Sequence, residues 1–207
     1  TNQKEASDFA LNMLDEYAKT YEELLAIPVI KGVKSESERF AGAEETYTCE
    51  MYVDANGKAI QGATSHYLGQ RFSKIFDISY TDKNNESKNV YQTCWGLTTR
   101  SIGSMIMIHG DDKGLVLPPK VAPYQVVIIP IPGKEEGIQN LSQSCNKIAE
   151  SLKKKGVRCY IDDRDNYNPG WKYNHWELKG VPIRIEIGAK EVQQKTATLV
   201  ARIDEVK

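Results

Sequence analysis

The chain has 207 residues, of which 40% are apolar and 27% charged, so it can form one large domain or two small ones. No apolar stretch approaches the roughly 20 residues of a membrane-spanning helix, which argues against a membrane protein. Four scattered cysteines, without a Cys-x-x-Cys pair, and three distant histidines argue against a structural zinc site and for thiols in a reduced cytosol. The chain starts without Met or a signal segment, so we expect a piece of a longer protein.

The net charge of −1 conceals an asymmetry between the two halves of the chain. Residues 1–118 carry 12 Lys and Arg against 17 Asp and Glu, whereas residues 119–207 carry 15 against 11. The second half is therefore the better candidate for a polyanionic partner, with an ordinary solvated surface as the alternative.

Apolar periodicity and turn residues predict helices and antiparallel strands in the first half. Phe9, Met13 and Tyr17 begin a series with helical spacing that stops before Pro28. Alternation around an Asn-Gly turn predicts a β-hairpin. We expect a helix at 5–26, strands at 46–53 and 58–62, a helix at 67–76, strands at 78–80 and 89–94, and a helix at 97–109.

Pro118, Pro119 and Pro123 mark a boundary, because proline donates no backbone hydrogen bond to a helix or a sheet. Beyond them, strands and helices alternate, which indicates a small α/β domain. We expect strands at 126–131, 157–161, 183–187 and 196–201, and helices at 135–155, capped by Gly156, and at 171–179. The sequence thus predicts one domain at residues 1–119 and another at 120–207.

An arginine stands at the start of an apolar, glycine-containing helix in the segment Trp95-Gly-Leu-Thr-Thr-Arg100-Ser-Ile-Gly103. A guanidinium held by a helix can lie on a nucleotide base or donate two hydrogen bonds to phosphate oxygens, and Thr98 and Thr99 add further donors. This arrangement suits ATP. The alternative is an ordinary buried helix that carries one exposed arginine.

With Gly114-Leu-Val-Leu-Pro-Pro119, this segment resembles motif 3 of class II aminoacyl-tRNA synthetases, and in wording the prolyl-tRNA synthetases of the eukaryotic and archaeal type. Three more segments resemble that family in its order: Glu38-Arg-Phe-Ala-Gly42, Gln61-Gly-Ala-Thr-Ser-His66-Tyr-Leu-Gly-Gln70, and the run from Arg164 to Arg184. The resemblance covers nearly the whole chain. It implies an incomplete α+β catalytic part of the class II type, an antiparallel sheet with helices, followed by a small α/β anticodon-binding domain.

The resemblance also implies a substrate site without a catalytic acid or base. The carboxylate of proline is already ionised, so positioning and charge neutralisation would drive its activation. Magnesium would be carried mostly by the phosphates of ATP, without a protein metal site. The residues expected to bind ATP are Gln61, Thr64, Thr98 and Arg100. Those expected to bind proline are Phe40, His66, Trp95 and Gly96, with core packing as the alternative for the aromatic residues and a structural hydrogen bond for His66.

The loop at 162–172 mixes charged, amide and aromatic groups, which suits the reading of unstacked RNA bases. Arg164 and Lys172 are the candidates for contacts with a tRNA anticodon. The alternative is a structural Asp/Arg network with Trp171 and Trp176 buried.

The activity that the resemblance implies is that of a cytoplasmic, ATP-dependent proline–tRNA ligase, which converts L-proline to prolyl-adenylate and transfers it to tRNA(Pro). A homodimer is implied for the full-length protein. Motifs 1 and 2 of the family would precede this chain, so we expect these 207 residues alone to be inactive. The alternatives are a noncatalytic tRNA-binding or regulatory relative with the same fold, and a synthetase for threonine, histidine or glycine.

Overall fold

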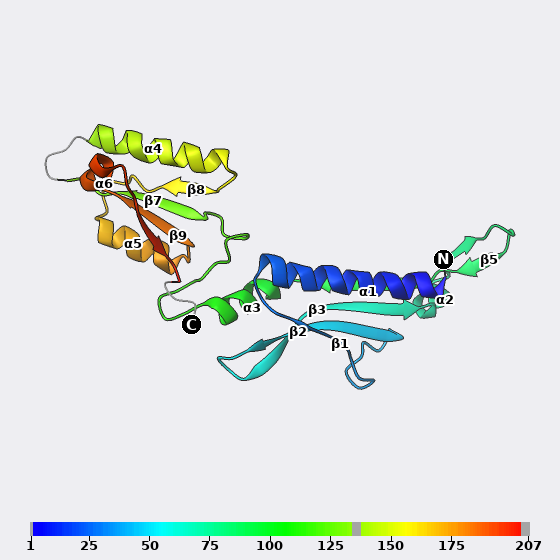
Figure 1. Ribbon diagram of the computed structural model, residues 1–207. Coiled ribbons are helices and arrows are strands. Elements are labelled where there is room, and N and C mark those ends of the chain that lie inside the picture. The colour runs from blue at the N-terminus through cyan, green and yellow to red at the C-terminus, as the bar shows by residue number, and fades with distance from the viewer. Residues whose placement is uncertain (1, 134–137, 204–207) are drawn as a thin grey trace. The chain divides into compact units, whose positions relative to one another are not determined.

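The computed structural model describes residues 2–133 and 138–203, without the side chains of 138–140. The chain folds into two compact units that divide between Ile108 and His109 (Figure 1). Each unit has its own sheet and its own core. Among the described residues, no helix is both long and apolar enough to pass through a lipid bilayer.

The first unit is built on a four-stranded antiparallel sheet with the strand order β1-β2-β3-β6. Its strands are β1 (Ile30–Val33), β2 (Glu45–Val53), β3 (Lys58–Gly69) and β6 (Gln92–Leu97). The sequence predicts the hairpin of β2 and β3 but misses β1, and it wrongly begins a helix at residue 67. Partly buried and buried side chains alternate from Thr64 to Tyr67, which is the period of a strand, so β3 continues to Gly69.

The helix α1 (Gln3–Lys19) lies along one face of this sheet (Figure 1). It begins at Asn2, whose side chain accepts a hydrogen bond from the Glu5 amide at 2.8 Å. Phe9 begins the apolar series that predicts this helix, yet 48% of its surface is exposed. Mostly small side chains form the buried stripe instead, and they let the helix approach the sheet closely: Ala6, Ala10, Leu14 and Ala18.

Hydrogen bonds fix this close approach of the helix to the sheet. Ser65 of β3 donates to the carbonyl of Ala10 at 2.7 Å. After α1 the chain continues as a π-helical turn, η1 (Thr20–Leu24), from which the Tyr21 hydroxyl donates to the carbonyl of Gly62 at 2.9 Å. Gly62 leaves no room for a side chain, because a Cβ there would lie 2.8 Å from the Tyr21 ring. One face of the sheet is therefore closed.

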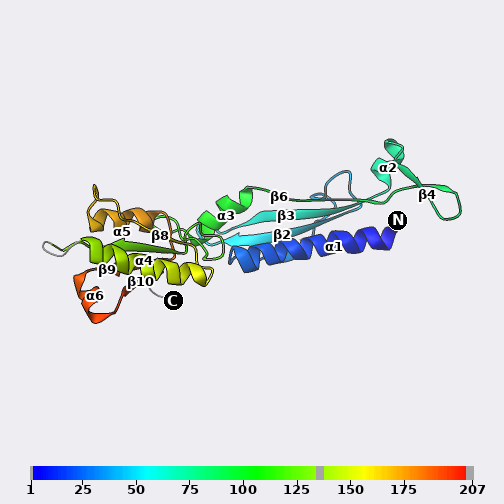
Figure 2. The same cartoon turned by 90° about the horizontal axis from the view of Figure 1, so that it is seen from above.

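Three short elements follow β3 in the chain. The expected helix at 67–76 reduces to α2 (Arg71–Ile75), which is followed by a small hairpin of β4 (Ser79–Thr81) and β5 (Ser87–Asn89). Figure 2 shows this hairpin extending beyond the end of the main sheet. After β6, α3 (Arg100–His109) begins three residues later than the sequence predicts, because residue 97 still belongs to the strand.

The second unit is a mixed sheet with the strand order β10-β9-β7-β8. The central strand β7 (Val126–Pro130) is parallel to β8 (Cys159–Ile161) and β9 (Ile183–Ile187), and β10 (Thr198–Ala201) is antiparallel to β9. Figure 1 shows α4 (Ile138–Lys154) and α5 (Pro169–Leu178) on opposite faces of this sheet. The predicted fold class, α+β followed by α/β, is confirmed.

The α/β prediction differs from the structure in detail. The structure adds a short helix, α6 (Ala189–Gln194), that the sequence does not predict. The predicted helix at 135–155 includes residues 135–137, which lie outside the described residues, as does the side chain of Ile138. Both faces of β7 are buried, with Val126 and Ile128 toward α4 and Val127 and Ile129 toward α5, which explains its continuous apolar sequence.

The structural division falls earlier than Pro119 because residues 111–122 are hydrogen-bonded to the second unit. The predicted functional boundary between residues 119 and 120 stays a prediction.

Replacing Ile128 by alanine should destabilise the second unit by about 2–5 kcal/mol, because it empties a fully buried position between β7 and α4. Leu199→Ala is the matched control, since Leu199 is 67% exposed, and it should change the free energy of unfolding by less than about 0.5 kcal/mol. Urea unfolding of the 207-residue chain measures both. Equal unfolding midpoints for the two variants would contradict the core position of Ile128.

Candidate functional site

The face of the first sheet that points away from α1 carries polar side chains from adjacent strands. Strand pairing places Thr46 opposite His66, and Thr64 opposite Gly96. Because successive side chains of a strand point to opposite faces, Thr64 and His66 lie on the side opposite Ser65, which contacts α1. We call this surface the open face and define it by the residues Thr46, Thr48, Glu50, Gln61, Thr64, His66 and Gly96.

Thr46 brings Phe40 and His66 together on the open face. The Phe40 amide donates to Thr46 Oγ1 at 3.3 Å, and the same oxygen lies 2.9 Å from His66 Nδ1. The rings of Phe40 and His66 lie with their centroids 5.4 Å apart. Thr46 is buried, whereas half of the surface of Phe40 is exposed. Two of the predicted proline-binding residues therefore form one corner with an apolar wall and a polar group.

The environment of His66 favours its neutral form. Burial lowers the pKa of the imidazole below its ordinary value, and the nearby ammonium of Lys34 lowers it further. A neutral imidazole offers one N–H donor and one acceptor. His66 is therefore suited to orienting a polar group of a ligand.

Arg100 lies where β3 and the start of α3 meet. Its Nη1 atom lies 3.4 Å from the carbonyl oxygen of Gln61, and its backbone amide donates to Thr98 Oγ1 at 3.3 Å. The side chain is exposed, and among the described residues no carboxylate forms a salt bridge with it. The structure thus brings Arg100, Gln61 and Thr98 together, with Thr64 farther along the open face of β3.

Trp95 is separated from the other predicted proline-binding residues. It pairs with Ser65 across the strands, and its ring lies 6.2 Å, centroid to centroid, from that of Phe9 on α1. Gly96 belongs to the open face, where a Cβ would meet no atom within 4 Å. The structure therefore brings Phe40, His66 and Gly96 to one face and leaves Trp95 on the other.

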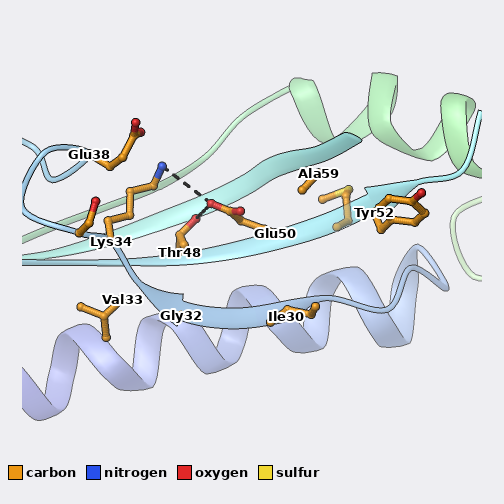
Figure 3. Close-up of a pocket in the computed structure, with 11 residues that line it drawn as sticks. Ile30, Gly32, Val33, Lys34, Glu38, Thr48, Glu50, Tyr52 and Ala59 are labelled. Carbon is orange, nitrogen blue, oxygen red and sulfur yellow. Dashed lines mark hydrogen bonds and ion pairs between the residues drawn. The ribbon is translucent and has the colours of Figure 1, made fainter. Parts of the chain in front are cut away.

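A cavity of about 520 Å³ adjoins the open face, between β2 and the segment that contains β1 (Figure 3). Lys34 Nζ lies 3.8 Å from a carboxylate oxygen of Glu50, to which the Thr48 hydroxyl donates at 3.4 Å. Glu50 pairs with Gln61 across the strands, so the cavity lies beside a predicted ATP-binding residue. The sequence reasoning missed Lys34 and Glu50. The alternation of Thr46, Thr48 and Glu50 along β2 is the signal that could have found this polar face.

In the second unit, Asp162 organises the loop that precedes α5. Its buried carboxylate accepts hydrogen bonds from Arg164 Nε at 2.8 Å, Arg164 Nη2 at 2.7 Å and Trp176 Nε1 at 2.8 Å. Burial alone would raise the pKa of this carboxyl, but the hydrogen bonds from Arg164 and Trp176 hold it below its usual range. Lys172 is 4% exposed and donates to the Asp162 carbonyl at 2.9 Å.

The outer side of Arg164 meets an aromatic stack. Its guanidinium lies 5.0 Å from the ring centroid of Tyr167 and 5.2 Å from that of Trp171, and these rings stack at 3.8 Å. Trp171 is 39% exposed, whereas Trp176 is buried. The structural alternative for this loop therefore holds for Trp176 but not for Trp171. Of the two predicted RNA contacts, Arg164 lies at the surface and Lys172 inside.

Two family models match the chain. The model described as the tRNA synthetase class II core domain (G, H, P, S and T) matches residues 1–109, which contain the open face. The model described as an anticodon binding domain matches residues 125–207, which contain the Asp162 loop.

Curated relatives resemble the chain over nearly its whole length. It is 49% identical over 203 residues to the cytoplasmic proline–tRNA ligase of Arabidopsis thaliana, an overlap of 98% of this chain and 38% of the relative. It is 52% identical over 199 residues to the proline–tRNA ligase of Alkaliphilus oremlandii, an overlap of 96% and 40%. The chain spans about two fifths of the length of these relatives.

Two solved structures of prolyl-tRNA synthetase are also similar to the chain over nearly its whole length. The crystal structure of prolyl-tRNA synthetase from Cryptosporidium parvum complexed with L-proline and AMP is 51% identical, with a TM-score of 0.93, over 99% of this chain and 44% of that one. The structure of the same enzyme with halofuginone and AMPPNP has a TM-score of 0.94, over 99% of this chain and 42% of that one.

Replacing Lys34 by methionine should raise the pKa of His66 toward its ordinary value, because one source of positive potential is removed while burial remains. A depressed histidine pKa means that the unfolded chain binds more protons, so the wild-type contribution of His66 to stability falls as the pH drops through about 6.5. NMR titration of the imidazole in both proteins measures the pKa. Lys58→Met, which removes an exposed lysine from the start of β3, is the control. An unchanged His66 pKa in Lys34→Met would contradict this assignment.

Proposed function

Because the chain belongs to the class II aminoacyl-tRNA synthetases, we propose that the full-length natural protein is a proline–tRNA ligase, which activates L-proline with ATP and transfers it to tRNA(Pro). The observation that supports the proposal is that the sheet presents an apolar corner for a small ring, while an exposed arginine contacts the carbonyl of Gln61 on β3. The corner is the Phe40–His66 pair, and the arginine is Arg100.

ATP fits the end of the open face at which α3 begins. We propose that Arg100 binds the adenine base and the terminal phosphate, while Gln61, Thr64 and Thr98 hold the nucleotide by hydrogen bonds. The open space above Gly96 lets the nucleotide approach the backbone of β6. Magnesium would enter with ATP and be carried mainly by its phosphates, because this ion retains several water ligands. The AMP and AMPPNP complexes of the Cryptosporidium parvum enzyme support the use of ATP.

Proline fits the corner formed by Phe40 and His66. The exposed part of the Phe40 ring can cover the apolar pyrrolidine, and the neutral imidazole can accept or donate a hydrogen bond at its polar end. Gly96 leaves space for the substrate. Trp95 is the fourth proposed pocket residue, although its ring lies against Phe9.

The chemistry proposed for these residues is positioning. The carboxylate of proline needs no base, so the residues act by holding it in line with the α-phosphate and by offsetting the charge that develops there. A cationic guanidinium at an exposed position suits the second task. No proton transfer to or from His66 is required.

The second unit is proposed to bind the anticodon of tRNA(Pro). Arg164 offers a cation to an unstacked base, and the stack of Tyr167, Trp171 and His175, in which Trp171 is 39% exposed, offers aromatic surface. A cavity of about 280 Å³ lies beside Arg164 and could receive a base. Lys172, the other proposed contact, has its amine on the Asp162 carbonyl and would act on RNA chiefly by supporting this loop.

We also propose that the full-length protein is a cytoplasmic homodimer, as the family resemblance implies. A noncatalytic tRNA-binding protein is the alternative function. It would need the Asp162 loop, but it would have no use for an apolar corner on the sheet or for an exposed arginine beside β3, so these features favour the ligase.

Replacing Arg100 by alanine in the full-length natural protein should lower proline-dependent ATP–pyrophosphate exchange by about 100-fold or more, because a charge that stabilises the phosphates is lost. His66→Ala should raise the KM for proline, because it loses an orienting group. Lys74→Ala, which removes an exposed lysine of α2, should behave like the wild type. If the wild type exchanges with no amino acid although it binds tRNA, the noncatalytic alternative is correct. If exchange is faster with threonine, histidine or glycine than with proline, that amino acid is the substrate instead.

Replacing Arg164 by alanine should raise the KM for tRNA(Pro) by about tenfold and leave ATP–pyrophosphate exchange unchanged, because the change is confined to the anticodon-binding unit. Steady-state charging assays measure the KM. Lys147→Ala removes an exposed positive charge from α4, away from the cavity beside Arg164, and serves as the control. An unaltered KM for tRNA(Pro) in Arg164→Ala would show that Arg164 does not contact the tRNA.

A further inference from the structure

The segment that joins the two units is bound along its length to the second unit. We call residues 110–122 the strap. The Leu115 amide donates to the carbonyl of Leu178 at 3.0 Å, and the Leu117 amide donates to that of Gly180 at 3.2 Å. These bonds place the strap against the end of α5. A segment rich in proline and glycine, which composition alone suggests to be a linker, is therefore ordered by backbone pairing.

An arginine anchors the first part of the strap. Arg202, whose side chain is only 3% exposed, donates from two guanidinium nitrogens to the two carboxylate oxygens of Asp111. Its Nε donates to the carbonyl of Glu177 at 3.0 Å. Such a bidentate pair is directional, because the planar guanidinium matches the carboxylate, although the Asp111 side chain is 46% exposed. Arg202 thus joins Asp111 of the strap to the end of α5.

A second arginine anchors the last part of the strap. Arg158, just before β8, donates from Nε to the carbonyl of Ala122 at 3.0 Å and from Nη2 to those of Pro119 and Lys120, each at 2.9 Å. Carbonyls that lie beside prolines have few backbone donors near them, so a guanidinium is an effective partner. The strap is therefore held at both ends.

The glycine at the turn of the strap is required by close contact. Gly114 has φ +130°, which side chains rarely tolerate, and a Cβ there would lie 2.6 Å from the carbonyl oxygen of Leu178. Even alanine at this position would force the strap away from α5. This close fit offers a way to release the strap that alters no charge.

Binding of the strap shortens the flexible connection between the units. The helix α3, which begins at Arg100, ends at His109, and Asp111 is already anchored, so Gly110 alone lies between two fixed residues. A released strap would free the thirteen residues 110–122. A flexible chain of that length has a root-mean-square extension of about 20 Å, compared with about 5 Å for one residue.

We propose that Asp111, Arg202 and Arg158 are positioning residues for the transfer of the amino acid to tRNA. The inference rests on the proposed function. A tRNA held by the second unit must also present its acceptor end to the first, and a connection held in one conformation restricts the positions that this end can take. The bound strap keeps the connection short. Activation of the amino acid, which does not involve tRNA, does not depend on it.

Release of the strap can be measured directly in the full-length natural protein. Asp111→Ala removes the carboxylate that Arg202 binds, and Gly114→Ala removes the close fit. Hydrogen exchange at the amides of Leu115 and Leu117 should be at least about tenfold faster in both variants. Asp112→Ala is the matched control, because it removes an exposed carboxylate of the strap, and amide exchange in this variant should match that of the wild type. Unchanged protection in both test variants would overturn the inference.

The positioning role is tested by comparing two activities of the same variants. Proline-dependent ATP–pyrophosphate exchange should stay within about twofold of the wild type, while kcat/KM for tRNA charging should fall about tenfold. Faster hydrogen exchange with unchanged charging would overturn the positioning role, and so would an equal loss of both activities, which indicates general destabilisation. A wild type without proline-dependent exchange would overturn the proposed function and this role with it. If only the positioning role is wrong, the wild type still shows proline-dependent ATP–pyrophosphate exchange, so the two failures can be distinguished.

Discussion

Closure of one sheet face by α1 is the constraint on which the first unit depends. The alanines of α1 let the helix lie close enough for Ser65 to bond the Ala10 carbonyl and for Tyr21 to bond that of Gly62. With that face closed, the pleat sends Thr64 and His66 to the other side. A shift of one residue in the register would press these polar groups against α1, so the packing of the core also determines the chemistry of the open face.

In the second unit, one buried carboxylate has a comparable role. Asp162 binds Arg164 and Trp176 with its side chain and Lys172 with its carbonyl. A buried charge is tolerated when hydrogen bonds satisfy it, and here they also fix the loop that leads into α5. Arg164 consequently has two roles, because one side of its guanidinium neutralises Asp162 while another meets Tyr167 and Trp171.

The strap lies in the chain between the two proposed sites. The residues proposed for activation precede it and end at Arg100, and the residues proposed for RNA recognition, Arg164 and Lys172, follow it. The chain between them is anchored by Arg202 and Arg158. Order in a connecting segment costs conformational entropy, which its backbone and guanidinium hydrogen bonds offset. The structure thus shows a connection that behaves as part of one unit.

The sequence by itself determined the family, the fold class and most of the elements, because motif spacing, apolar periodicity and turn residues are local signals. It also predicted the grouping of Phe40 with His66 and of Gln61 with Arg100. Only the tertiary structure decided which sheet face each residue occupies, since Trp95 follows the register of Ser65 to the side of α1. Likewise, the burial of Lys172 and the partners of Arg202 depend on contacts between residues far apart in the chain, and no local pattern records them.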